Sequence, residues 1–167
     1  MKKTINILLS LAFALSLAST VEAKRGSDGQ LNLLYWQAPS TMNPNLSGGT
    51  KELEASSVVL EPFARYDENG SLVPFLAEEI PTVANGGISK DLTSITWKIK
   101  KGIKWSDGSA LTADDAIFTY EYCSNPDTGC TQSNYWADIK SVTAVNSTTV
   151  KVEFTVPKPF PYAPFVG

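Results

Sequence analysis

The sequence predicts a mixed fold of the α/β or α+β class in which short strands outnumber helices. Two stretches, residues 63–74 and 139–156, combine alternating apolar positions with central turn residues, which is typical of β-hairpins. One stretch, residues 113–122, carries a clear helix-start pattern. No internal repeat of solenoid length is present. We therefore expect strands of mixed direction packed with a few helices.

Residues 1–23 are typical of a secretory signal peptide rather than of a folded segment. Two lysines precede an apolar stretch that is shorter than the roughly 20 residues needed to span a bilayer. Val21-Glu22-Ala23 then resembles a cleavage site, so we expect the mature protein to begin at Lys24. No cysteine lies near that cut, which predicts a periplasmic protein without a lipid anchor.

The charge balance argues against a nucleic-acid partner. The chain has a formal net charge of -3, and removal of Lys2, Lys3 and Glu22 with the signal peptide would make it -4. The basic cluster over residues 98–104 is interleaved with apolar residues, as in a half-buried strand, and phosphate binding needs more concentrated positive charge.

In the first half of the mature chain, the compact apolar run over residues 31–36 predicts a buried strand. Residues 37–50 are rich in Pro, Asn and Gly, which predicts a loop. Residues 51–60 fit a short helix that stops before Pro62, because the residue before a proline disfavours helical backbone.

A hairpin is predicted next, with short extended pieces over 63–66 and 71–74 joined by Asn69-Gly70. Residues 76–80 suggest one helical turn. Asn85-Gly86-Gly87 is a further turn signal, and it leads into a strand predicted over 91–100.

The helix predicted over residues 113–122 begins after Thr112, whose hydroxyl can cap the first amides at a gain of about 1 kcal/mol. Asp114 and Asp115 complement the positive end of the helix. The second hairpin, with strands over 139–145 and 149–156, follows. The proline-aromatic stretch 157–167 is expected to lead into further structure, with a proline-rich C-terminal extension as the alternative.

Cys123 and Cys130 flank a run of turn-forming residues, and in an exported protein such a pair is expected to form a disulfide. Closing so small a loop stabilises the fold by about 2.5 kcal/mol in the chain-entropy treatment. A metal site is the alternative. It is disfavoured because the chain has no histidine and two thiols do not complete a tetrahedral zinc shell.

The sequence offers little catalytic chemistry. Without histidine, the Ser-His and Cys-His arrangements cannot form. The neighbouring carboxylates Asp114-Asp115 and Glu78-Glu79 could serve an acid/base hydrolase. However, adjacent side chains on a helix point apart, and helix-start electrostatics explains Asp114 and Asp115. We expect no catalytic residues, metal or cofactor.

Two segments, in order, resemble the family 5 bacterial extracellular solute-binding proteins, the oligopeptide and dipeptide binders of ABC importers. Residues 60–79 resemble an early segment of that family that ends in Pro-x-Leu-Ala-Glu. Residues 96–118 resemble its signature region, with Lys-x-Gly-aliphatic-Lys-aromatic-x-Asp-Gly followed by Thr-Ala-Asp-Asp-aliphatic. Trp105-Ser106 and Ala110-Leu111 depart from the commoner residues.

The resemblance implies a periplasmic-binding-protein-like type II fold, a two-lobed venus-flytrap. Residues 24–167 would supply the N-terminal part of lobe I with its extra subdomain. It also implies a monomer that captures a peptide, or a similar solute such as an oligosaccharide, an opine, or a nickel or haem complex, for a membrane permease.

The resemblance places one segment at the ligand groove. For Trp36 the alternative is a role as an ordinary core residue. The segment consists of Trp36, Gln37, Ala38, Pro39, Ser40 and Thr41. A secreted hydrolase domain or a secreted structural or interaction module remain alternative functions.

Overall fold

The computed structural model describes residues 29–30 and 32–167, and the chain divides into two units, residues 1–36 and 37–167. The predicted signal peptide lies outside the described residues. In the first unit, residues 29–30 and 32–36 form neither helix nor strand, and Leu33, Leu34 and Trp36 are exposed. The prediction of a buried strand over 31–36 is therefore wrong for its described part, because an apolar run becomes a strand only where another strand pairs with it.

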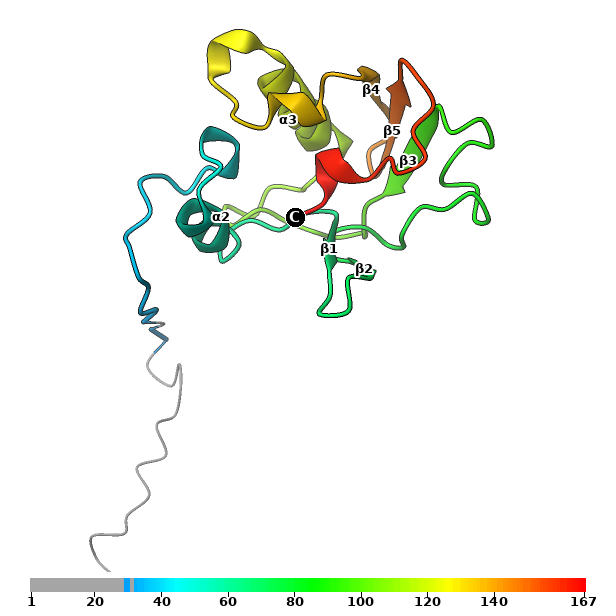
Figure 1. Ribbon diagram of the computed structural model, residues 1–167. Helices are drawn as coiled ribbons and strands as arrows, with labels where there is room; N and C mark the ends of the chain where they lie inside the picture. The colour runs from blue at the N-terminus through cyan, green and yellow to red at the C-terminus, as the bar shows by residue number, and fades with distance from the viewer. Residues whose placement is uncertain (1–28, 31) are drawn as a thin grey trace, which may run out of the picture. The chain divides into compact units, whose positions relative to one another are not determined.

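The core of the second unit is a three-stranded antiparallel sheet with the order β3-β5-β4 (Figure 1). Its strands are β3 (Ser94–Lys98), β4 (Ile139–Asn146) and β5 (Thr149–Phe154). Alternation along each strand turns one face inward, with Ile95 and Trp97 on β3 opposite Val152 and Val150 on β5. The predicted second hairpin is thus confirmed.

β3 is shorter than the strand predicted over residues 91–100. Leu92 has a φ of 59°, in the left-handed region, and the Asp91 carboxylate accepts hydrogen bonds from the amide and hydroxyl of Thr93. This turn prevents the strand from starting earlier, because extended backbone requires a negative φ.

The helix α3 (Ala113–Ser124) packs on this sheet and confirms the predicted helix start. The hydroxyl of Thr112 accepts a hydrogen bond from the amide of Asp114, and the Asp115 carboxylate accepts one from the Thr112 amide at 2.7 Å. This capping box satisfies amides that a helix N-terminus otherwise leaves unpaired. Ala113, Ala116 and Cys123 form its buried face.

The predicted disulfide between Cys123 and Cys130 is present, and both residues are buried. It joins the last turn of α3 to the end of a loop that contains the 3₁₀ helix η2 (Pro126–Thr128). A further 3₁₀ turn, η3 (Ser133–Tyr135), follows the bridge.

A second sheet pairs β1 (Ala64–Tyr66) with β2 (Leu72–Pro74), as the first predicted hairpin requires. The chain's last described residues run back beside β1 (Figure 1). There, Val166 follows the 3₁₀ turn η4 (Ala163–Phe165) and forms a parallel bridge with Ala64. The rings of Phe63 and Phe165 stack with centroids 5.0 Å apart.

The helical turn predicted over residues 76–80 is wrong. Ala77 forms an antiparallel bridge with Ile99, and the amide of Glu78 donates to the carbonyl of Lys98 at 2.8 Å. These groups are satisfied by pairing with the end of β3. Extended pairing therefore replaces the local helical hydrogen bonds.

The loop that leaves the first unit contains the 3₁₀ helix η1 (Pro44–Leu46) and leads to the helix α2 (Thr50–Ser56). α2 is shorter than the helix predicted over 51–60. The hydroxyls of Ser56 and Ser57 donate to carbonyls within the helix, which competes with helical backbone bonding. The β-branched pair Val58-Val59 that follows also disfavours helix continuation.

Candidate functional site

The segment predicted to contact the ligand, residues 36–41, is at the surface. In the second unit, Gln37, Ala38, Pro39 and Ser40 are exposed and Thr41 is half-buried, with no regular secondary structure. Trp36 belongs to the first unit, is 70% exposed, and has its ring 6.0 Å from that of Tyr35. The reading of Trp36 as a core residue is therefore wrong. The ligand role of these residues stays a prediction.

A buried carboxylate from α2 fixes residues 37–41. Glu52 is 1% exposed, and its Oε1 accepts the Ser40 amide at 3.0 Å and the Ser40 hydroxyl at 2.7 Å. Lys51 Nζ lies 3.2 Å from the same oxygen and also donates to the carbonyl of Ala38 at 3.3 Å. Hydrogen bonds to an ionised carboxylate are stronger than those between neutral groups, so they hold Ser40 firmly against α2.

These bonds stabilise the charged form of Glu52. The amide and hydroxyl of Ser40, followed by Lys51, lower the pKa of Glu52 from 4.5 to about 2. Burial alone would raise the pKa, because it disfavours a charge, so the hydrogen bonds outweigh desolvation. Glu52 is thus ionised in the neutral pH range.

Glycine at position 49 is part of the same arrangement. A Cβ atom added at Gly49 would lie 2.5 Å from Glu52 Oε2, closer than real Cβ contacts allow. The carbonyl of Gly49 accepts the Glu52 amide at 3.1 Å, at the first turn of α2. A larger residue at position 49 would therefore push the carboxylate away from its position beside Ser40.

A second set of hydrogen bonds holds the same loop at η1. The Thr131 amide donates to the Asn45 carbonyl at 2.8 Å, and Gln132 Nε2 donates to the Pro44 carbonyl at 3.2 Å. The Thr131 hydroxyl also points to the Asn45 carbonyl, at 3.3 Å. Both donors follow Cys130 directly in the chain, so the disulfide-bridged loop and η1 lie side by side (Figure 1).

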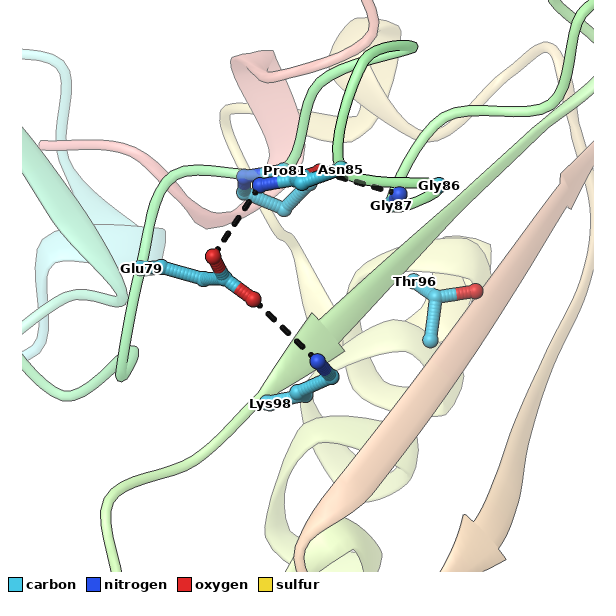
Figure 2. A pocket seen from close by; sticks show the side chains of 7 residues that line it. All are labelled: Glu79, Pro81, Asn85, Gly86, Gly87, Thr96 and Lys98. Atoms are coloured by element: carbon cyan, nitrogen blue, oxygen red, sulfur yellow. Dashed lines mark hydrogen bonds and ion pairs between the residues drawn. The ribbon is translucent and has the colours of Figure 1, made fainter.

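A hollow of about 100 Å³ lies between residues 79–87 and β3. Figure 2 shows the residues that line it. Glu79 Oε1 pairs with Lys98 Nζ at 3.1 Å, and Glu79 Oε2 accepts Asn85 Nδ2 at 3.2 Å. Asn85 Oδ1 in turn accepts the amides of Thr82 and Gly87. The polar groups satisfy one another, and the hollow is far below the 300–1,000 Å³ of ordinary ligand pockets. These hydrogen bonds stabilise the turn over residues 79–87.

The carboxylate pairs considered for hydrolysis have structural roles. Asp115 caps α3, and Glu79 belongs to the ion pair with Lys98. Within residues 29–30 and 32–167, no group of three or more His, Cys, Asp or Glu residues is placed to hold a metal ion. Nor does any helix in this part of the chain have the length and apolar character of a membrane span.

The residues that fix the 37–41 segment were not predicted from the sequence. Glu52 occupies a first-turn position where an acidic residue is explained by the helix dipole alone. Gln132 is one polar residue in a polar loop, 88 positions from its partner. The position of Glu52 at the start of a helix was visible in the sequence, but its bond to Ser40 was not. No local pattern indicated a role for Gln132.

The comparisons with known proteins agree on one family. The family profile "Bacterial extracellular solute-binding proteins, family 5 Middle" matches residues 71–167, more than half of the chain. A "Probable ABC transporter-binding protein" of Deinococcus radiodurans is 32% identical over 92% of this chain and 27% of its own length. The "Oligopeptide-binding protein OppA" of Bacillus subtilis is 28% identical over 96% of this chain and 33% of its own length.

Solved structures share the fold. The crystal structure of NikZ from Campylobacter jejuni in complex with Ni(L-His) superposes with a TM-score of 0.65 at 28% identity. The match covers 77% of this chain and 24% of NikZ. The chain thus spans about a quarter to a third of the length of the curated relatives that it matches. Its fold is that of part of a periplasmic-binding-protein-like type II protein, and the chain belongs to the family 5 bacterial extracellular solute-binding proteins.

Proposed function

We propose that this protein captures a short peptide in the periplasm and delivers it to the membrane permease of an ABC importer. The observation that carries the proposal is the surface segment 37–41, which is exposed yet held by the buried Glu52 carboxylate. Membership in a family of solute-binding proteins, and an OppA relative named for oligopeptide binding, support the choice of solute.

An exposed segment that is already fixed suits recognition of a peptide backbone. Extended peptides are commonly bound through main-chain hydrogen bonds to an exposed strand edge, and an ordered, exposed segment offers main-chain groups of the same kind. A binding segment that is ordered before the ligand arrives avoids the entropy cost of ordering on binding. The attachment of Ser40 and Ala38 to α2 provides this preorganisation.

The mechanism that we propose is capture by closure of two lobes. Residues 24–167 would form the N-terminal part of lobe I and its extra subdomain. A solute that contacts both lobes stabilises the closed state, and its differential affinity for the closed over the open state drives the change. We also propose that the protein acts as a monomer and is not an enzyme.

Identification of the bound solute tests the proposed function. The protein, expressed from its complete gene and purified without denaturant, should release peptides on unfolding that mass spectrometry identifies. Added peptides should raise the unfolding temperature, because a ligand that binds only the folded state stabilises it. Recovery of the peptides intact after incubation would argue against a hydrolase. A thermal shift with nickel and histidine but with no peptide would contradict the choice of solute.

A pair of tryptophan variants tests the site. Trp36→Ala should weaken peptide affinity about tenfold or more, because aromatic anchors dominate binding energy at such surfaces. Trp105→Ala is the matched control, since Trp105 is also exposed but lies outside residues 36–41. Equal affinities for the two variants, measured by calorimetry, would remove Trp36 from the site.

The proposed export is tested by the N-terminus of the mature protein. Protein recovered from the periplasmic fraction should begin at Lys24, if the signal peptide is cleaved after Ala23. Retention of Met1, or recovery only from the cytoplasmic fraction, would contradict periplasmic delivery.

A further inference from the structure

Residues 37–46 are restrained from two sides. On one side, Glu52 of α2 accepts the amide and hydroxyl of Ser40. On the other side, the amide of Thr131 and the side chain of Gln132 donate to the carbonyls of Asn45 and Pro44. The groups that hold η1 on this second side come from residues that follow Cys130 in the chain. The position of η1 therefore depends on residues about 90 positions later in the chain.

Local hydrogen bonds link the two restraints. The Leu46 amide donates to the Asn43 carbonyl at 3.2 Å, and the Asn45 amide donates to Asn43 Oδ1 at 2.9 Å. The Asn43 amide in turn donates to the Thr41 hydroxyl oxygen at 3.1 Å. A displacement of η1 is thus transmitted over a few bonds to Thr41 and its neighbour Ser40.

The disulfide determines where Thr131 and Gln132 lie. Cys123 is buried on the core face of α3, and its bond to Cys130 fixes the residue directly before Thr131. Residues 124–129 consist of turn formers and are largely exposed, so the disulfide is the covalent restraint that ties this loop to the core face of α3. The bond holds the Cα atoms of Cys123 and Cys130 5.1 Å apart.

We propose that the Cys123–Cys130 disulfide, acting through Thr131 and Gln132, is a positioning device for the ligand-facing segment 37–41. This inference rests on the proposed function for its link to solute binding. In this proposal the disulfide and Gln132 act on the position of the segment and not on the solute directly. They are positioning residues that hold η1, and through it Ser40, in the geometry that the solute meets.

Amide hydrogen exchange in the solute-free protein tests the structural half of the proposal. Gln132→Ala removes a single hydrogen bond to η1 and leaves the core intact. Exchange at the Leu46 and Ser40 amides should accelerate about threefold to tenfold, the effect expected for one neutral hydrogen bond. Exchange at Val150 and Val152, in the middle of the sheet, should stay within twofold.

Thr128→Val is the matched control. The Thr128 hydroxyl donates to the carbonyls of Tyr122 and Asn125 within the same disulfide loop, and it makes no hydrogen bond to η1. This variant should leave the Ser40 and Leu46 exchange rates unchanged. An equal acceleration in Thr128→Val and Gln132→Ala would overturn the proposal, because the effect would then be a general loosening of the loop.

Reduction of the disulfide with a phosphine should act as Gln132→Ala does, and more strongly. Exchange at Ser40 and Leu46 that stays within twofold either on reduction or in Gln132→Ala would also overturn the proposal. If the reduced protein unfolds, Gln132→Ala still provides the exchange measurement, because it keeps the disulfide.

Peptide titration tests the link to binding. In the protein expressed from its complete gene, Gln132→Ala should weaken peptide affinity by the same factor by which it accelerates Ser40 exchange. Faster exchange with unchanged affinity would overturn this link. If the unmodified protein binds no peptide, the proposed function fails, while the exchange data still decide whether the disulfide positions Ser40.

Discussion

Glu52 Oε1 accepts two hydrogen bonds from one residue, the amide and the hydroxyl of Ser40, twelve positions earlier. In an ordinary N-cap, a side chain before the helix accepts amides of the first turn. Here a side chain of the first turn accepts the amide and hydroxyl of a residue in the loop before the helix. It couples the first turn of α2 to an exposed segment that otherwise has no regular structure. The charge state of one carboxylate therefore affects the order of the loop.

Acidification is predicted to weaken this attachment. The folded-state pKa of Glu52 is about 2 and the ordinary value is 4.5, so the ionised carboxylate stabilises the folded protein. Because the folded pKa is the lower one, that contribution is complete above pH 4.5 and is lost as pH falls towards 2. Urea unfolding should show Glu52→Gln less stable at pH 7, with the difference shrinking across that window.

The control for this experiment is Glu68→Gln, in the exposed turn between β1 and β2. At pH 7 it should leave the free energy of unfolding nearly unchanged, because Glu68 is exposed. A difference between Glu52→Gln and the unmodified protein that stays constant across the window would contradict the role of the Glu52 charge.

Loss of the cap of α3 is predicted to destabilise the second unit. Thr112→Ala removes the hydroxyl that accepts the Asp114 amide, and should lower the free energy of unfolding by about 1 kcal/mol. Thr119→Ala is the comparison, since the Thr119 hydroxyl donates to a helical carbonyl inside α3 and caps nothing. Similar losses for both variants in chemical unfolding would argue against capping as the cause.

Glycine is predicted to be required at position 87 by contact rather than by backbone angle. A Cβ atom at Gly87 would lie 2.7 Å from Pro81 Cα, and Gly87→Ala should cost about 1–3 kcal/mol as the turn shifts. At Gly48 an added Cβ meets no atom within 4 Å, so Gly48→Ala should be neutral or slightly stabilising. Thermal unfolding of the two variants compares them directly, and equal midpoints would refute the contact.

The buried indole of Trp97 is predicted to tolerate one substitution and not another. The side chain is fully buried, its ring lies 5.6 Å from that of Phe63, and its Nε1 has no hydrogen-bond partner among the described residues. Trp97→Ala should cost about 3–5 kcal/mol through cavity formation. Trp97→Phe should cost less than about 2 kcal/mol, because it also removes an unsatisfied donor. Equal losses on denaturant unfolding would contradict this account.

The elements that could be predicted from the sequence are those that neighbouring residues determine. The Thr112 capping box sets the start of α3, and the turn at Asn69-Gly70 and the alternation of β4 and β5 set the hairpins. The disulfide followed from two cysteines across a short turn in a chain that we expect to be exported. In each case the responsible residues lie within about fifteen positions of one another.

The elements that could not be predicted depend on distant partners. Residues 32–36 have the composition of a strand, yet strand formation requires another strand beside them. Ala77 became extended because it pairs with Ile99. At the candidate site, the exposed loop was predicted from its prolines and glycines, whereas its attachment to Gln132 involves no local pattern.

The bridge between Ala64 and Val166 also bears on how the second unit folds. It joins positions about one hundred residues apart, so its formation carries the entropy cost of closing a long loop. The hairpin of β4 and β5, with α3 beside it, needs only short closures and gains its contacts first. We therefore expect stacking of Phe165 on Phe63 to be a late folding step that follows formation of the hairpin of β4 and β5.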